Sequence, residues 1–240
     1  MTTLLLVLAL AAGPALAAAD AADVGAAGAA GKAASTAASA AAPAPAPGPR
    51  AFAPVDEAVR DADFFAFRAQ LQTALARHDA AAVLAVVHPQ VRNGFGGDDG
   101  AAAFRRRWKP GRRDSRMWET LATALALGGT FMGPDGFAAP YVYSAWPQEI
   151  DAFEHVALLG QRVPVRAEAA AAAPVLATLD GAIVPLAAPL KPESGWVAVR
   201  LPDGRRGHVA RAQVRSPVEY RALFNREGGR WRLTALVAGD

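Results

Sequence analysis

The sequence predicts an α+β fold in which a mainly helical N-terminal domain is followed by a small β-barrel. Three observations lead to this prediction. Large apolar side chains recur at helical spacing between residues 61 and 127, which is typical of amphipathic helices. From residue 155 onward they form short runs with period two, bounded by turn residues, as in small barrels. Before residue 50 the chain is nearly all Ala, Gly and Pro, which provides too little large apolar surface for a core.

Residues 1–19 are predicted to be a signal peptide. The apolar run at residues 4–10 is too short to span a bilayer, which takes about 20 such residues. Ala15 and Ala17 supply the small side chains that a signal peptidase requires. No Lys or Arg precedes the run, so either the amino terminus alone carries the positive charge or translation starts elsewhere. A signal peptide predicts a periplasmic or secreted protein with no transmembrane span, and an Ala-rich coil is the alternative.

Residues 20–52 are predicted to be a disordered linker. The segment ends in alternating Ala and Pro, which excludes a continuous helix and favours an extended spacer. The chain has no cysteine, so disulfides, thiolate nucleophiles, Cys-ligated zinc and a lipid anchor on cysteine are excluded. The formal net charge of +3 gives no overall attraction to nucleic acid.

A helical or α+β domain is predicted at residues 53–150, and its first helix covers residues 61–75. Asp61 and Asp63 lie in the first turn of this helix, where the helix dipole favours acidic side chains. Three more helices are predicted: residues 80–87, the segment that carries Phe104 and Trp108, and residues 118–127. Residues 137–143 are predicted to be loop and strand. The aromatic segment at residues 137–146 either packs as a strand and its turn or lines a pocket.

Short strands are predicted throughout residues 155–215. They cover residues 155–159, 163–166, 175–179, 182–186, 196–200 and 207–209. After Pro217, a C-terminal hairpin is predicted over residues 217–240, with its strands at residues 220–224 and 230–237. The sequence Glu227-Gly228-Gly229 provides the turn of this hairpin.

Residues 155–215 resemble a bacterial SH3-like (SH3b) domain. The resemblance is carried by Val163-x-Val-Arg166, Val175-x-x-x-Leu179 with Gly181, Gly195-Trp-Val-x-Val199, Asp203-Gly-Arg205 and Gly207-x-Val209. It implies a targeting or interaction module, often for the cell wall. The sequence departs from the family in the Ala-rich loop after Glu168 and in His208, which replaces an aromatic residue. Binding of Pro-rich peptides needs an aromatic-lined groove, so this mode is disfavoured.

Three positions of the SH3-like segment have predicted structural roles. Trp196 is its largest side chain, and loss of a core Trp costs about 3–5 kcal/mol. Asp203-Gly204 supplies the positive φ of a tight hairpin. Gly207 leaves room where the chain closes on its neighbour.

The flanks of this segment resemble the start and finish of a cystatin-like α+β cone of the nuclear-transport-factor type. The resemblance is carried by the first two helices, by Phe95-Gly-Gly-Asp-Asp-Gly100 and by residues 229–240. It implies that the C-terminal hairpin pairs back onto the N-terminal domain and that the barrel is an insertion. A discrete helical domain followed by the barrel is the simpler alternative.

The sequence carries no catalytic motif, so no catalytic residue, metal ligand or cofactor is predicted. The histidines at positions 78, 88, 155 and 208 lack the spacing of metal ligands. There is no G-x-S-x-G nucleophile elbow. Asp98 and Asp99 lack the spaced ligands of a calcium loop and indicate a polar turn.

The sharpest charge cluster runs from Arg105 to Arg113, together with Arg116. It begins with Arg105, Arg106 and Arg107, which are followed by Trp108. One interpretation is a binding site for an anionic partner, with Trp108 stacking on it or inserting into it. The alternative is that Trp108 anchors the core together with Phe104, four residues earlier, while the arginines are solvated.

The barrel contributes Trp196, Arg205 and His208 as further candidate binding residues. Together these observations predict an exported, non-catalytic binding module that attaches to peptidoglycan or to an envelope protein, and export disfavours nucleic acid as the partner. Two alternatives stay open. One is a small-ligand-binding protein or enzyme with a pocket near His88, Trp108 and Tyr141. The other is a purely structural barrel that holds the N-terminal domain rigid.

Overall fold

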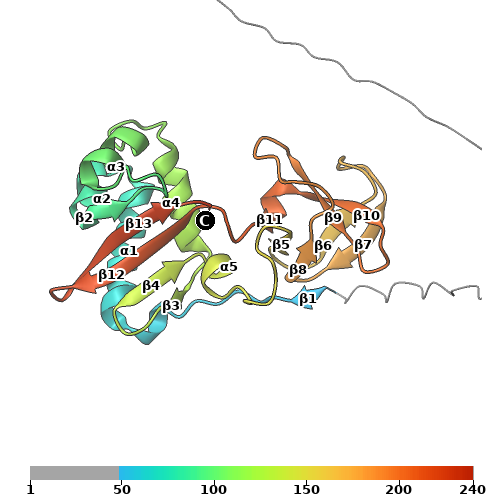
Figure 1. Cartoon of the computed structure of the whole chain (residues 1–240), viewed down its shortest axis with the longest axis horizontal. Helices are drawn as coiled ribbons and strands as arrows, with labels where there is room; N and C mark the ends of the chain where they lie inside the picture. The colour runs from blue at the N-terminus through green and yellow to red at the C-terminus, as the bar shows by residue number, and fades with distance from the viewer. Residues whose placement is uncertain (1–48, 240) are drawn as a thin grey trace, which may run out of the picture. The chain divides into compact units, whose positions relative to one another are not determined.

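The computed structural model describes residues 49–239, in which helices and strands combine in an α+β architecture with three sheets (Figure 1). The α+β class predicted from the sequence is therefore confirmed. The predicted signal peptide, and all but the end of the predicted linker, lie outside these residues. None of the helices between residues 49 and 239 is long and apolar enough to cross a membrane.

The helices are α1 (Ala62–Ala76), α2 (Ala80–Val86), α3 (Ala101–Trp108), α4 (Arg116–Ala126) and α5 (Tyr141–Ser144), with short 3-10 turns at Ala58–Arg60 and Arg211–Gln213. The strands are β1 (Arg50–Ala51), β2 (Val87–Arg92), β3 (Thr130–Phe131), β4 (Gly136–Ala139), β5 (His155–Leu158), β6 (Val163–Arg166), β7 (Val175–Leu179), β8 (Ala182–Pro185), β9 (Trp196–Arg200), β10 (Arg206–Ala210), β11 (Val214–Arg215), β12 (Arg221–Glu227) and β13 (Arg230–Val237).

Side-chain caps fix where three of the helices begin. The carboxylates of Asp61 and Asp79 and the hydroxyl of Ser115 accept backbone N–H groups at 2.8, 2.9 and 3.1 Å, at the starts of α1, α2 and α4. Each cap satisfies one of the N–H groups that a helix leaves without a partner in its first turn. These starts agree with the apolar spacing in the sequence to within about two residues, as is normal for helix ends.

The C-terminal hairpin lies in the middle of a five-stranded sheet with the order β2-β13-β12-β4-β3. β13 is parallel to β2 and β12 is antiparallel to β4, so the last strands of the chain lie between two of the first (Figure 1). The hairpin turns at Gly228 and Gly229, whose φ angles of 55° and 77° lie in the left-handed region that such a turn requires. The hairpin is therefore part of the N-terminal domain's own sheet.

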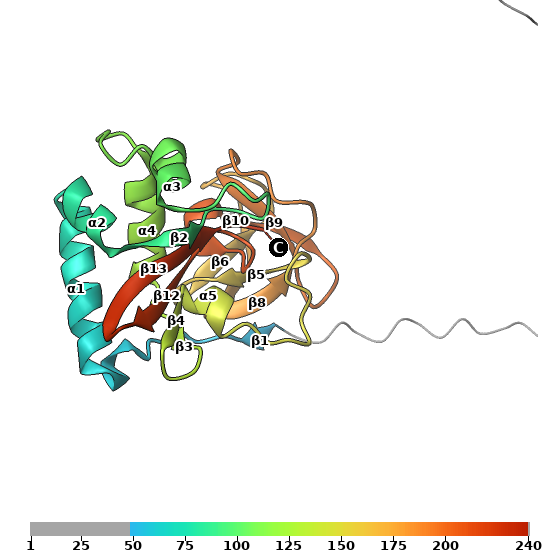
Figure 2. The same ribbon diagram turned by 60° about the vertical axis from the view of Figure 1, so that its left-hand side comes forward.

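The helices α1 to α4 lie beside this sheet (Figure 2). They share with it one core that is rich in aromatic side chains. The ring centroid of Phe64, on α1, lies 4.1 Å from that of Phe137 on β4 and 4.8 Å from that of Trp231 on β13. Other large members are Phe104, Trp108, Met117, Trp118, Leu121, Phe224, Leu233 and Leu236. Residues from both ends of the chain are thus needed to fill this core.

The chain between β4 and β12 forms most of two four-stranded sheets, β1-β8-β5-β11 and β7-β6-β10-β9. Both sheets contribute to a second core that is aliphatic and dominated by valine. Its buried members are Val156, Leu158, Val163, Val165, Val184, Val197, Val199, Leu201, Val209 and Val214. A bridge between Leu186 and Val199 links the two sheets at one edge. Each strand predicted between residues 155 and 209 is present.

The start of the folded part differs from the sequence prediction. Arg50 and Ala51 form β1, which pairs with β8, and Phe52 is buried. The predicted linker therefore ends too late, because three residues that follow the Pro-rich run take part in the fold. The ring centroids of Phe52 and Tyr141 are 5.1 Å apart. Because Tyr141 is distant in the sequence, no local pattern predicted the burial of Phe52.

The segment at residues 137–143 also differs. The strand β4 ends at Ala139, and residues 141–144 form the helix α5. Pro140 has no N–H to donate to a neighbouring strand, so it ends the ladder and stands at the start of the helix.

Candidate binding site

The helix α3 places Trp108 in the aromatic core and its three arginines outside. Trp108 is buried, and its ring centroid lies 5.1 Å from that of Tyr220. Arg105, Arg106 and Arg107 are exposed. Of the two interpretations of this cluster, the structure has the one in which Trp108 is an anchor of the core. Trp108 is therefore not available to stack on a ligand.

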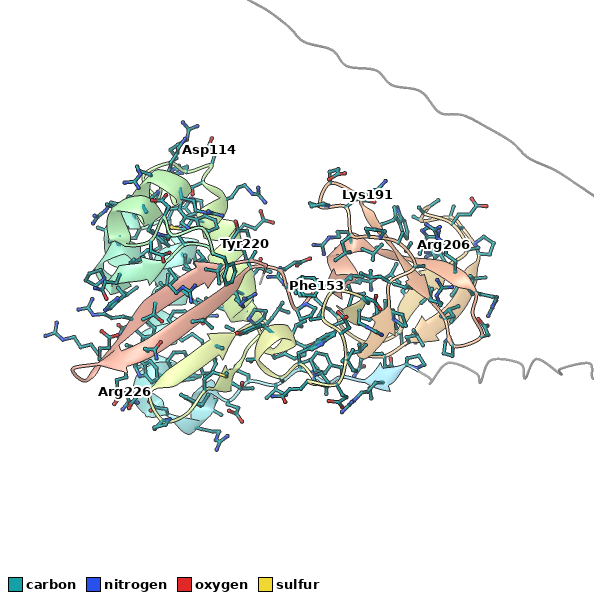
Figure 3. The ribbon with its side chains drawn as sticks, in the orientation of Figure 1. Asp114, Phe153, Lys191, Arg206, Tyr220 and Arg226 are labelled. Atoms are coloured by element: carbon teal, nitrogen blue, oxygen red, sulfur yellow. The ribbon has the colours of Figure 1, made fainter. Side chains whose placement is uncertain are left out.

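The three arginines of α3 have different partners. Arg106 forms an ion pair with Asp98, with 2.8 Å between Nη2 and Oδ1. Arg107 donates to the hydroxyl of Tyr220 at 3.2 Å. Arg105 has no ion-pair partner within residues 49–239. Of these three arginines, Arg107 is thus the one with a hydrogen bond to the segment that leads into β12, where Tyr220 is labelled in Figure 3.

Trp196 does not have the structural role that the sequence predicts. Along β9, Val197 and Val199 are buried, whereas Trp196 is half-buried and does not belong to the aliphatic core. Successive side chains of a strand point to opposite faces, so a core built on Val197 and Val199 leaves Trp196 on the outer face. The prediction that Trp196 is a core residue is therefore wrong.

The outer face of the sheet β7-β6-β10-β9 presents Trp196 beside small side chains. Trp196 on β9 lies opposite Ala210 on β10. Two residues away on β10, His208 lies between Ala198 of β9 and Arg166 of β6. On this face Trp196 and Ala210 form one cross-strand pair, and Pro164 and Thr178 form another. We call these four residues the Trp196 row. It is a strip that carries one aromatic ring.

Arg205 lies in the tight turn between β9 and β10, and its side chain serves that turn. Its Nε lies 2.6 Å from Oδ2 of Asp203, and its backbone N–H donates to Oδ1 at 2.9 Å. These two hydrogen bonds from Arg205, the backbone one first, hold the pKa of the Asp203 carboxyl below its usual range. Its neighbour Arg206 is exposed (Figure 3) and has no ion-pair partner in the described part of the chain. The Arg205 side chain thus stabilises the turn, and this role competes with the binding role predicted for it.

The alternative site near His88, Trp108 and Tyr141 is not assembled. Nε2 of His88 lies 2.8 Å from Oε2 of Glu227 on the neighbouring hairpin. Trp108 belongs to the aromatic core, whereas Tyr141 belongs to a separate cluster with Phe52. Burial raises the pKa of the Tyr141 hydroxyl. The three residues therefore do not face one cavity.

A second group of arginines, which sequence reasoning missed, gathers around Phe95. Arg92, at the end of β2, and Arg221, at the start of β12, both lie over the Phe95 ring, with 5.6 and 5.7 Å from the guanidinium carbon to the ring centroid. Arg221 also lies 4.5 Å from the centroid of Tyr143 on α5. The two arginines are far apart in the sequence, and only the parallel pairing around β13 brings them to one end of the sheet. No local pattern could have found them.

A cleft of about 560 Å³ lies beside the segment that leads into β12. Glu219 on its wall binds two arginines: Arg211, and Arg215 with 3.0 Å between Oε2 and Nη1. Burial is the main cause that lowers the pKa of the Arg215 guanidinium, although Glu219 opposes it. One carboxylate shared by two arginines leaves an excess of positive charge in the cleft.

Among residues 49–239, no three His, Asp or Glu side chains lie close enough together to hold a metal ion. The sequence matches no model of a known protein family and no curated protein. The resemblance of residues 155–215 to an SH3-like domain therefore rests on the quoted residues themselves and stays a prediction.

Proposed function

We propose that this protein is an exported, non-catalytic binding protein that attaches to peptidoglycan or to an envelope protein through an SH3-like barrel formed by residues 155–215. The arrangement of this segment supports the proposal, because short strands in two sheets surround one aliphatic core. The tight turn at Gly204, with φ of 83°, and the close approach at Gly207 correspond to the motif positions of the resemblance.

The observation that carries this proposal is the Trp196 row. A half-buried Trp that the core does not need is free to contact a ligand, and Trp is over-represented among residues that dominate binding energy. Its cross-strand partner Ala210 has a small side chain, and Trp196 itself is only half-buried. His208 and Arg166, in the next row, supply polar groups. Such a strip suits a sugar ring or an extended peptide, and peptidoglycan contains both.

The direct test is co-sedimentation of the full chain, after removal of the signal peptide by the host, with purified cell-wall sacculi at low and high salt. We expect saturable pelleting that persists at high salt, because stacking on Trp196 is not screened by ions. Pelleting that disappears at high salt would show that exposed arginines alone attract the protein to the sacculi, because salt screens that attraction. Absence of pelleting at both salt concentrations would overturn wall binding. The mature N-terminus, determined on the same material, tests cleavage after the signal peptide.

Replacement Trp196→Ala separates binding from folding. We expect at least a tenfold loss of affinity for sacculi and a change in the free energy of unfolding of only about 1 kcal/mol, because the core is formed by the alternate residues of β9. Phe153→Ala is the matched control, since Phe153 is also aromatic and is 58% exposed (Figure 3) but lies outside the Trp196 row. Equal loss in both variants would show that the row has no special role.

A structural role is the second candidate, and one specific observation favours it. Ala157 on β5 and Ile183 on β8 are buried in one cluster with Phe52 and with Tyr141 and Val142 of α5. The outer face of the sheet β1-β8-β5-β11 is thus covered by residues that flank the N-terminal helices. Such a buried contact holds an inserted module in place. This role would account for the molecule if neither sacculi nor envelope proteins bind it.

A further inference from the structure

Arg221 is buried without a carboxylate partner. Its residue surface is only 6% exposed, and its Nε is a buried donor with no acceptor. None of the ion pairs within residues 49–239 includes it. Buried arginines are almost always paired, because an uncompensated charge away from water is costly. In the same domain, for example, Nη1 of the buried Arg68 lies 2.7 Å from Oδ1 of Asp56.

Aromatic rings hold the Arg221 guanidinium in place. Its central carbon lies 4.5 Å from the ring centroid of Tyr143 and 5.7 Å from that of Phe95. Stacking of this kind is favourable and limits the rotation of the side chain. The guanidinium is therefore preorganised, and ligand binding loses little conformational entropy of this side chain.

Two further arginines reach the same loop. The guanidinium carbon of Arg92 lies 5.6 Å from the Phe95 centroid. Nη1 of Arg107 lies 3.7 Å from the position that a Cβ atom would take at Gly94. Neither forms an ion pair in the part of the chain that the structure describes; Arg107 donates only to the Tyr220 hydroxyl. Arg92 and Arg221, from β2 and β12, share the Phe95 ring, and we call them the Phe95 arginines. Arg107, from α3, lies beside them in the loop at Gly94.

The acidic residues of the loop are already engaged. Asp98 pairs with Arg106 at 2.8 Å, and Oδ1 of Asp99 accepts the backbone N–H of Asn93 at 2.9 Å. The buried Asn93 side chain in turn donates to the carbonyls of Asp98 and Gly100, which fixes the loop. Arg92 and Arg221 therefore carry like charges at one ring, and neither forms an ion pair within residues 49–239. Binding of an anion would offset the repulsion between these like charges.

We infer that the Phe95 arginines form a binding site for a carboxylate group, and that Phe95 is the surface on which the rest of the ligand packs. A stacked guanidinium presents a rigid fork of donors that matches the two oxygens of a carboxylate. Phe95 is 49% exposed, so its ring is accessible beside the charges. The choice of a carboxylate rests on the proposed function, because the peptides of the cell wall end in free carboxylates. The site lies on the five-stranded sheet and is separate from the Trp196 row.

The test is a titration of the full chain with N-acetyl-D-alanyl-D-alanine, with its C-terminal amide, and with inorganic phosphate. The readout is isothermal calorimetry together with the NMR signal of the Arg221 Nε–H group. We expect the free carboxylate to bind and to shift this signal, and the amide to bind at least tenfold more weakly. Equal binding of acid and amide would overturn the inference. Tighter binding of phosphate than of the peptide would overturn the assignment to a carboxylate.

Two variants of the site and one control make the test specific. Arg221→Gln removes the buried charge, and we expect about a tenfold loss of affinity for the free carboxylate. Phe95→Ala changes a half-exposed residue that the core does not contain, so it tests the site even if Arg221→Gln fails to fold. Arg77→Gln is the matched control, because Arg77 is exposed, forms no ion pair in the described residues and carries the same charge. Affinities equal to that of Arg77→Gln in both site variants would exclude the site.

The outcomes for this site and for the proposed function are distinguishable. If sacculi pellet the wild-type chain and both site variants equally, wall binding stands and the Phe95 arginines have no part in it. If sacculi bind nothing while the carboxylate still shifts the Arg221 signal, the site exists and its ligand has another origin.

Discussion

At the residue scale, Gly207 has the closest approach to the core of the small sheets. A Cβ atom at this position would lie 2.3 Å from Cγ1 of Val165, whose side chain is fully buried. A short β-branched side chain inside a core cannot rotate away cheaply. The reason that the sequence suggested for this glycine, a close approach of neighbouring strands, is the one that the structure shows.

Gly207→Ala is expected to destabilise the protein by about 1–3 kcal/mol, because the new methyl group overpacks the core at Val165. The measurement is the free energy of unfolding in urea, followed by a signal from residues 155–215. Gly195→Ala is the control, since a Cβ atom there meets no heavy atom within 4 Å. Equal stability of the two variants would contradict the packing argument.

Trp108 and Trp196 show how far the burial of a tryptophan can be predicted from the sequence. The spacing of Trp108 from Phe104 along a helix favoured burial, and both are buried. Trp196 was assigned to the core on its size alone, but its position in the alternation of β9 places it outside. Periodicity therefore predicted the burial of each Trp better than size did.

At the element scale, the start of α1 depends on one carboxylate with two partners. Asp61 accepts the Phe64 N–H at 2.8 Å and also binds Arg226 of the C-terminal hairpin. The backbone N–H of Phe64 is the largest cause, with the charge of Arg226, that holds the pKa of Asp61 below its usual range. A carboxyl group with a lowered pKa in the folded state stabilises the fold above its unfolded pKa, and this contribution disappears as the pH falls through the folded pKa.

Asp61→Asn is expected to lower the free energy of unfolding at pH 7 by roughly 1 kcal/mol and to make its decrease below about pH 4 less steep, because Asn can still cap the helix but does not titrate. Urea unfolding between pH 2 and 7 measures both effects. Asp63→Asn removes the same charge from the first turn without removing the cap, so it serves as the control. A wild-type slope in the Asp61 variant would contradict this role.

Much of the element order was predictable, because apolar spacing and turn residues act over a few positions. The helices α1 to α4 and the strands β5 to β10 follow from such local patterns. The burial of Phe52 and the end of β4 at Pro140 depend on distant partners or on the neighbouring ladder. At the candidate site, Arg221 comes from β12 and Tyr143 from α5, so the site could not be derived from the charge cluster that begins at Arg105.

At the scale of the whole molecule, the last strands of the chain are the central strands of its largest sheet. β12 and β13 lie between β2 and β4, and Phe224, Trp231, Leu233 and Leu236 belong to the aromatic core. The second core, in contrast, is formed by residues 156–214 alone. The two cores therefore depend differently on the end of the chain.

A chain that ends at Ser216 is expected to lose the fold of residues 53–150, because it lacks two central strands and the side chains that fill the core. Residues 155–215 are expected to keep dispersed amide signals in a two-dimensional NMR spectrum. A chain without residues 238–240, which follow β13, is the control and should keep both sets of signals. Dispersed signals from residues 53–150 in the shorter chain would contradict the prediction.

The pairing of Val87 with Leu233 sets an order on biosynthesis. The ribosome makes β2 early, but β13, which pairs with it, emerges only after residues 93–229 have been made. Contacts so distant in sequence also form slowly. The aromatic core therefore cannot close, and this part of the nascent chain stays open, until β13 has emerged. Export through a narrow channel needs a chain in that unfolded state, so the late closure of the sheet would keep the proposed exported protein ready for translocation.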